Sequence, residues 1–192
     1  MTSELSEIVS SDLDELILVN SDDIQIGKRE KKVCHLKQGE LHRAFSIFIF
    51  NTQGEVLLQQ RSEQKFLWPM YWSNACCSHP RVGENSEDAA RRRLEQELGI
   101  STELTYLYKF EYHAEYNSIG SEHELCWVWV GVAEAKNISP NSNEIANLKF
   151  LSKKDLDQEL LHNPKIYTPW MKMEWQRIFE DHNDTLKKIM KD

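Results

Sequence analysis

The stretch Trp72-Ser-Asn-Ala-Cys-Cys-Ser-His-Pro80 is short, polar and rich in reactive side chains. It carries the thiol of Cys77 two residues before the imidazole of His79. Because a residue before proline avoids helical backbone angles, Pro80 favours an extended conformation here. Side chains two apart on an extended segment point the same way, so we expect Cys77 and His79 to face one cavity. A thiol beside an imidazole can serve as a nucleophile, an acid or a metal ligand.

The composition indicates a globular protein with one domain. The chain has 192 residues, 40% of them hydrophobic, and six tryptophans, enough for one full-sized core. Its formal net charge of -8 argues against general affinity for nucleic acid or anionic membranes. An anionic substrate would therefore need a metal ion or a local basic patch.

Cysteine usage and the N-terminal sequence both bear on the cellular location of the protein. Four cysteines, at 34, 76, 77 and 126, follow no paired metal-binding spacing, and two adjacent thiols make a poor disulfide framework. A reducing, cytoplasmic location is the expectation. Residues 1–14 read as an acidic, flexible leader without signal-peptide features, followed by one domain over 15–192. No apolar run approaches transmembrane length, and the oligomeric state stays open between monomer and weak dimer.

Alternating apolar residues and turn signals predict a mixed α/β (α+β) domain. Strands are expected at 16–19, 24–27, 44–50, 55–60, 104–113, 125–132 and 146–151, with 44–50 and 55–60 forming a hairpin. Helices are expected at 85–98, at 152–161 after the cap Ser152, and from Pro169 to about Ile189. No repeat or linker interrupts the chain.

The helix expected at 85–98 has one unusual inward residue. Ala90, Leu94 and Leu98 form its apolar stripe, and Glu97 falls in the same stripe. A carboxylate on an inward face is costly unless it is paired or bound to a cation. Glu97 is therefore the most informative residue of this helix.

Five further residues offer imidazole or carboxylate ligands. Two of the imidazoles flank a glycine-containing turn, a third follows the thiol, and two carboxylates sit two apart where a strand begins: His35, His42, His79, Glu122 and Glu124. Such a mixed nitrogen and oxygen set suits Mn²⁺, Mg²⁺ or Zn²⁺. On spacing alone, unrelated surface groups are the alternative.

Three blocks together resemble a known family. They are the Trp72–Pro80 stretch, the segment 122–126 (Glu-His-Glu-Leu-Cys) and the segment 168–171 (Thr-Pro-Trp-Met). In this order and spacing they resemble the type 1 isopentenyl-diphosphate isomerases, whose fold is that of the Nudix superfamily. The resemblance runs from about Leu16 to the final helix. It implies a Nudix-type mixed sheet sandwiched between helices.

The Nudix box is recognisable but incomplete. The pattern G-x5-E-x7-R-E-U-x-E-E-x-G-U, with U aliphatic, retains Glu84, Arg92 and Glu97. It has Ser78 for its first glycine, Arg93 for one glutamate and Gln96 for another. Pyrophosphohydrolases of the superfamily use these glutamates to hold metal ions around a diphosphate. The resemblance therefore implies a box kept for metal and diphosphate binding rather than for hydrolysis.

The reaction that the resemblance implies is a 1,3-allylic proton shift between isopentenyl and dimethylallyl diphosphate. The family's acid and base carry over to Cys77 and Glu124, which must reach the carbon skeleton from opposite sides. The sequence leaves open which of them gives the first proton. Glu124 would be both metal ligand and proton shuttle. The neighbouring Cys76 is not expected to be catalytic.

The remaining site residues follow from the same resemblance. Tyr112 and Trp170 match positions whose aromatic faces stabilise a carbocation, although Trp170 also suits an ordinary helix start. Three cations match diphosphate contacts: Lys31, Arg61 and Lys65; a solvated surface is the alternative reading for each. Glu97 would hold a Mg²⁺ that bridges to the diphosphate, and the other divalent metal would sit in the His/Glu set. The expected partner is a small isoprenoid diphosphate, with no nucleic acid or membrane.

Three other functions compete with this interpretation. A Nudix pyrophosphohydrolase would leave the Cys77 and Glu124 pair without a purpose and would release phosphate from nucleotides. A metal-stabilised binding module would lose nothing when Cys77 is replaced. A Cys-His hydrolase lacks the oxyanion and orienting signals that such enzymes need.

Overall fold

Strand β3 (His42–Phe50) lies inside the sheet on which the protein is built. In this computed structural model, which describes residues 7–190, residues 44–50 are buried on both faces of the strand. The strand pairs in parallel with β8 (Gly120–Val132) and antiparallel with its other neighbours. A continuous apolar run is what a strand covered on both faces requires.

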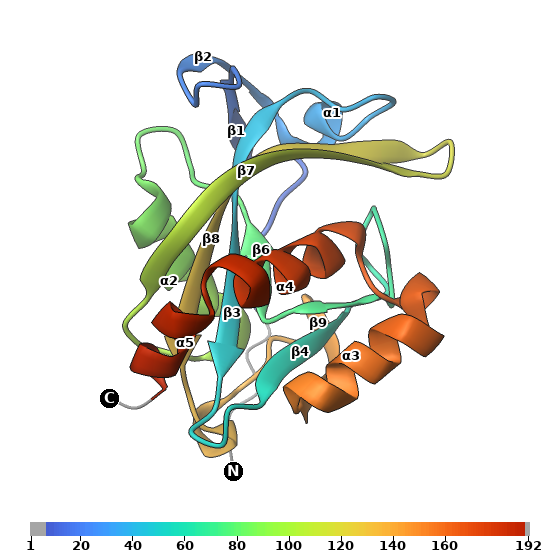
Figure 1. Cartoon of the computed structure of the whole chain (residues 1–192). Helices are drawn as coiled ribbons and strands as arrows, with labels where there is room; N and C mark the ends of the chain where they lie inside the picture. Colours follow the sequence, from blue (N-terminus) through green and yellow to red (C-terminus); the bar gives the residue numbers. More distant parts are fainter. Residues whose placement is uncertain (1–6, 191–192) are drawn as a thin grey trace.

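The other strands complete one nine-stranded mixed sheet within the described residues. They are β1 (Glu15–Val19), β2 (Gln25–Glu30), β4 (Val56–Arg61), β5 (Trp72–Asn74), β6 (Cys76–Ser78), β7 (Thr105–Tyr116) and β9 (Ile145–Leu151). Each predicted strand is confirmed in place and type. Strands β7 and β8 are longer than expected and form a hairpin that arches past the body of the sheet toward the short helix α1 (Lys31–Cys34) (Figure 1).

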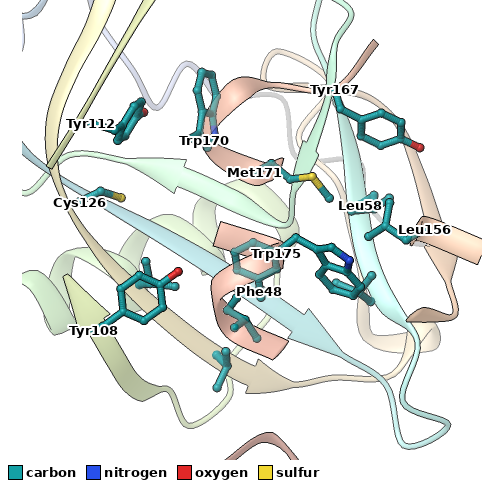
Figure 2. Close-up of a cluster of buried hydrophobic side chains, with 14 of the residues drawn as sticks. Phe48, Leu58, Tyr108, Tyr112, Cys126, Leu156, Tyr167, Trp170, Met171 and Trp175 are labelled. Atoms are coloured by element: carbon teal, nitrogen blue, oxygen red, sulfur yellow. The ribbon is translucent and has the colours of Figure 1, made fainter. Parts of the chain in front are cut away.

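Helices cover both faces of the sheet. Helix α2 (Ser86–Leu98) packs Leu94 and Leu98 on one face, in a cluster with Phe45 and Ile47. Helices α4 (Pro169–Asp181) and α5 (Asn183–Ile189) cover the other face (Figure 1). Figure 2 shows the second cluster, in which aromatic side chains of α4 meet those of the sheet. The predicted sandwich is therefore confirmed.

The predicted caps of α2 and α3 (Lys153–His162) form as expected. The Asn85 side chain accepts a hydrogen bond from the Asp88 amide at 2.9 Å, and Gly99 ends α2 with a φ of 66°. Ser152 accepts from the Asp155 amide at 3.2 Å. These contacts satisfy amides or allow backbone angles that a helix end needs. Short 3-10 helices at Ala135–Asn137 and Pro164–Ile166 were not expected.

The prediction of one long final helix is wrong. The backbone leaves the helix at His182, whose ring stacks on Tyr108 with centroids 5.0 Å apart. Asn183 and Asp184 follow, and asparagine and aspartate favour caps and turns over helix interiors. The chain therefore breaks into α4 and α5.

Residues 7–14 of the expected leader contact the folded body, and residues 1–6 of that expectation lie outside the described residues. Val9 is buried, and its carbonyl accepts a hydrogen bond from Arg93. Asn141 donates to the Glu7 carbonyl at 2.8 Å, and Lys31 contacts the Ser10 hydroxyl. Across residues 7–190, no helix combines the length and apolar character that crossing a membrane would take.

Candidate active site

Two neighbouring strand pairs bring the catalytic candidates together. The parallel register of β3 and β8 places His42 beside Glu124, and the β7–β8 hairpin places Tyr112 on the other side of Glu124. The Tyr112 hydroxyl donates to Glu124 Oε2 at 2.7 Å. Both Tyr112 and Glu124 are buried. The carboxylate is thus held between a phenol and an imidazole.

The tip of the β7–β8 hairpin positions His35. Gly120 forms a bridge with Leu36, and the Ser121 amide donates to the His35 carbonyl at 3.0 Å. A side chain at Gly120 would collide with that carbonyl oxygen, so only glycine permits this close approach. The contact places His35 Nε2 2.8 Å from Glu122 Oε2.

Five side chains meet in one cluster, and they are the set expected from the sequence: His35, His42, His79, Glu122 and Glu124. One nitrogen or oxygen atom from each lies within 4.8 Å of all the others. Nδ1 of His35 lies 2.6 Å from the Lys31 carbonyl, and Nδ1 of His42 lies 2.7 Å from the Glu40 carbonyl. A carbonyl can only accept, so both Nδ1 atoms carry a proton and both Nε2 atoms face the cluster, where each can bind an ion when unprotonated.

The cluster fits a divalent cation. Glu122 Oε2 is buried and, although close to His35, accepts no hydrogen bond of good geometry from the described residues. Nε2 of His42 and Nε2 of His79 lie 3.1 Å apart, an arrangement that suits two ligands of one ion better than two charged rings. Burial and the neighbouring imidazoles hold the pKa of His79 well below its usual value, so its nitrogen is available as a ligand.

The thiol of Cys77 lies beside this cluster on the same face of the sheet. Its sulfur is 3.3 Å from the Ser46 hydroxyl and 3.1 Å from Asn74 Oδ1. Burial raises the pKa of Cys77 to about 12. Cys76 points to the opposite face and is buried in the α2 core, which explains the expectation that it is not catalytic.

A cavity of about 360 Å³ opens in front of these groups, a size suited to a small ligand. Cys77, Glu124, Tyr112 and Trp170 all contribute to its wall. The Tyr112 and Trp170 rings lie 6.2 Å apart, at one end of the aromatic cluster (Figure 2). Arg61 stands 5.4 Å from the centre of the Trp170 ring. Trp170 is therefore a cavity wall as well as part of the core.

Cations form part of the cavity wall. Lys31, Lys65 and Arg93 line it together with Arg61 and the carboxylate Glu144. Arg61 is held by hydrogen bonds to the carbonyls of residues 67 and 68, and Lys65 pairs with Glu144. Burial and the charge of Lys65 lower the pKa of Lys31 to about 8. This concentration of positive charge suits a diphosphate.

Glu97 lies on the inward face of α2, as expected, but its contact is a cation from its own helix. Arg93 Nη2 is 2.6 Å from Glu97 Oε1, and both side chains are buried. This ion pair also accounts for the inward position of Glu97. Its role as a ligand of Mg²⁺ stays a prediction.

Several polar residues of the site were not found from the sequence: Ser46, Asn74, Arg93, Glu144 and Glu174. Ser46 is a polar residue in an otherwise apolar strand, and Glu174 lies four residues after Trp170 on the inward face of α4. The argument applied to Glu97 could have found Glu174. Arg93 and Glu144 come together only in the folded chain, at 3.5 Å.

Comparison with known proteins places this site in a family. The sequence profile described as NUDIX domain matches residues 40–171. A structure of a Deinococcus radiodurans protein superposes with a TM-score of 0.71 at 21% identity, over 85% of this chain and 98% of that one. A MutT protein from Methanosarcina mazei superposes with a TM-score of 0.58 at 18% identity, over 74% and 95% of the two chains. Both likenesses show the fold.

Sequence relatives define the group more narrowly. The chain is 42% identical to "Isopentenyl-diphosphate Delta-isomerase 1" of Photorhabdus laumondii, over 91% of this chain and 99% of that protein. It is 36% identical to the protein of the same name from Bos taurus, over 88% of each. The chain belongs to the Nudix family and, within it, to the isopentenyl-diphosphate Delta-isomerases.

Proposed function

We propose that this chain is a metal-dependent isomerase that interconverts isopentenyl diphosphate and dimethylallyl diphosphate. The observation that carries the proposal is the shared cavity. It is lined by a thiol, a tyrosine-bound carboxylate and an indole face, together with the cations Lys31, Arg61, Lys65 and Arg93. A five-carbon diphosphate likewise combines an apolar and an anionic part.

The reaction needs two proton transfers on the hydrocarbon end. A proton is added to the terminal methylene carbon of isopentenyl diphosphate, which leaves a tertiary cation at the adjacent carbon. A proton is then lost from the carbon on the other side, and the double bond forms there. Cys77 and Glu124 are the proposed acid and base, in either order, because both line the cavity beside Trp170 and Tyr112. The aromatic faces favour the cation between the two steps.

The proposed metal site is the His/Glu cluster, with Mn²⁺, Mg²⁺ or Zn²⁺ as candidates. When bound there, the ion supplies positive charge that fixes and acidifies the groups around it. The protein residues set the rest: Tyr112 orients the Glu124 carboxylate, and the carbonyls behind His35 and His42 fix their rings.

The diphosphate end is assigned to Lys31, Arg61 and Lys65, with Arg93 beside them. We propose that Glu97 binds a Mg²⁺ shared with the diphosphate, in competition with its contact to Arg93. The proposal also places the enzyme in the cytoplasm, because its four cysteines are free thiols. It requires neither nucleic acid nor membrane, and it holds for a monomer or a weak dimer.

Arg93 and Gln96 stand where the Nudix pattern has glutamates, and the loss of these two carboxylates disfavours the rival pyrophosphohydrolase, which needs them for metal. The test is to incubate the purified protein with isopentenyl diphosphate and Mg²⁺ and to measure dimethylallyl diphosphate. The wild type should form it without releasing phosphate, and Cys77→Ala or Glu124→Gln should abolish it. Cys76→Ala should cost little. Phosphate release from nucleoside diphosphates, or full activity of Cys77→Ala, would refute the proposal.

A further inference from the structure

A buried carboxyl group lies behind the Cys77 thiol, away from the cavity. Glu174 projects from α4 and is fully buried. Its Oε2 lies 2.8 Å from the Ser46 hydroxyl, and its Oε1 accepts from the Cys126 thiol at 3.6 Å. Ser46 stands directly opposite Cys77 in the pairing of β3 with β6. Ser46 therefore connects the carboxyl group to the thiol.

Glu174 differs from the buried carboxylates Glu97 and Glu144 because no lysine or arginine pairs with it within residues 7–190. Glu97 is paired with Arg93, and Glu144 with Lys65 and Arg93. The side-chain partners of Glu174 are the neutral groups of Ser46 and Cys126. An unpaired carboxylate in such surroundings takes up a proton rather than staying charged. Burial accordingly raises the pKa of Glu174 to about 8.

Because Ser46 can make only a limited number of hydrogen bonds, the protonation of Glu174 affects the hydrogen bond between Ser46 and Cys77. The Ser46 hydroxyl has one proton and two lone pairs, and it has three partners. Asn74 Nδ2 donates to it at 2.8 Å and also contacts the carbonyls of residues 47 and 76, which fixes the orientation of that amide. Of Glu174 and Cys77, one must therefore donate to Ser46 and the other must accept from it.

A neutral Glu174 donates to Ser46, and the Ser46 proton then points at the Cys77 sulfur. The sulfur can accept that hydrogen bond whether or not it carries its own proton, which as a thiol it directs to Asn74 Oδ1. An ionised Glu174 takes the Ser46 proton for itself, and the sulfur loses its donor. A sulfur that gains and loses a proton in each turnover needs the first arrangement.

We propose that Glu174, as a neutral acid acting through the Ser46 hydroxyl, is a positioning residue for the Cys77 thiol. This inference rests on the proposed function, in which the thiol exchanges a proton with the substrate. Glu174 touches neither the cavity nor the metal cluster, so its effect falls on turnover and not on substrate binding.

Other titratable groups lie around Glu174 on the elements packed against it. Cys77 faces it from β6, Cys126 and Glu124 from β8, and Tyr108 from β7, whose hydroxyl donates to the Glu174 backbone carbonyl at 3.4 Å. Arg177, on the same helix, stacks on the Tyr108 ring at 4.2 Å. None of these groups is lost when Glu174 becomes glutamine. A change in pH dependence on that substitution is therefore assigned to Glu174.

The test compares kcat and KM for isopentenyl diphosphate in several variants. Glutamine keeps an N–H that can donate to Ser46 and an oxygen that can accept from Cys126, so Glu174→Gln mimics the neutral acid. Glu174→Leu and Ser46→Ala remove the connection. We expect kcat to fall by up to about 100-fold in both, the low end of what a positioned proton donor or acceptor contributes, with KM changing little. The exposed Glu180→Gln on the same helix is the matched control and should leave both constants unchanged.

The pH profile separates positioning from packing. Wild-type kcat should fall as pH rises past about 8. It is measured at saturating substrate, so that the titration of Lys31, a substrate-binding residue, affects it little. Glu174→Gln cannot ionise and should retain most of the neutral-pH kcat without this fall. If Glu174→Gln keeps the alkaline fall, or is as impaired as Glu174→Leu, the inference is overturned. Circular dichroism and metal content show whether Glu174→Leu folds. If it does not, the inference is tested by the pH profile of kcat in Glu174→Gln and by the kcat of Ser46→Ala. A wild type inactive on isopentenyl diphosphate would instead refute the proposed function.

Discussion

Arg93 and Glu97 form a buried ion pair one turn apart on α2, with Nη2 2.6 Å from Oε1. Arg93 stands where the Nudix pattern has a glutamate, so a cation now occupies a position that serves metal binding elsewhere in the superfamily. The same guanidinium lies 3.5 Å from Glu144 and lines the cavity. Arg93 thus stands in place of a carboxylate of the pattern, pairs with Glu97 and Glu144, and brings a cation to the cavity wall.

Arg93→Met should therefore destabilise the fold strongly. It leaves the buried carboxylates of Glu97 and Glu144 without this cation, and breaking a buried pair from one side typically costs about 3–5 kcal/mol. Arg91→Met is the matched control, because Arg91 forms an exposed pair with Glu87 on the same helix, worth at most about 1 kcal/mol. Urea unfolding measures both. Equal losses in the two variants would contradict the assignment.

Gly120→Ala should weaken metal binding. A methyl group at this position meets the His35 carbonyl oxygen, so the hairpin tip must move away and take Glu122 with it. Disturbing groups that orient metal ligands typically lowers affinity about 10- to 100-fold. Gly27→Ala is the control, because its added carbon would lie 3.6 Å from the nearest atom, an ordinary contact. A calorimetric titration with Mn²⁺ measures the metal affinity of each variant, and an unchanged affinity in Gly120→Ala would refute the prediction.

The stability of the fold should respond to pH through Glu174. Its folded-state pKa is raised from the usual 4.5 to about 8, so the folded protein binds a proton that the unfolded chain releases. Stability therefore falls as pH rises from about 4.5 to about 8, and the loss is complete above that. The Glu174→Gln variant lacks this loss, so its free energy of unfolding should rise relative to that of the wild type across the same pH range, by on the order of a few kcal/mol. A constant difference from pH 5 to 9 would speak against a raised pKa.

Tyr112→Phe should lower turnover without preventing substrate binding. It removes the hydroxyl that donates to Glu124 Oε2 at 2.7 Å and keeps the aromatic face toward the cavity. We expect kcat to fall about 10- to 100-fold, the usual loss when a group that orients a metal-ligating side chain is removed, while KM changes little. Tyr106→Phe, on the exposed part of the same strand, should match wild type. Comparable kcat values for the two variants would remove Tyr112 from the site.

The sequence allowed the order and type of the main strands and helices to be predicted, because their apolar periods and caps are local. The thiol-imidazole stretch and the five metal-site candidates could also be named. The register that joins them could not, because His42 meets Glu124 only through a parallel pairing of residues 82 positions apart along the chain (124 − 42). Glu174 could have been noticed as an inward carboxylate, but its link to Ser46 could not. Their meaning comes from the hydrogen bonds that the packed α4 makes with β3.

The break at His182 shows a different limit. A proline and an N-cap predicted where the last helix begins, and both are local signals. Its interruption depends on the stacking of His182 on Tyr108, a contact between distant segments. Tertiary contacts of this kind override helical propensity and leave little trace in the sequence.

The central claim is that a thiol and a metal-site carboxylate move protons on a five-carbon diphosphate. Isomerisation of isopentenyl diphosphate in deuterated water with Mg²⁺, read by mass spectrometry and NMR, tests it most directly. With the wild type we expect deuterium at the new methyl carbon of dimethylallyl diphosphate, and with Cys77→Ala or Glu124→Gln no exchange at any carbon. Product formed without deuterium, or undiminished incorporation in the Cys77→Ala protein, would contradict it.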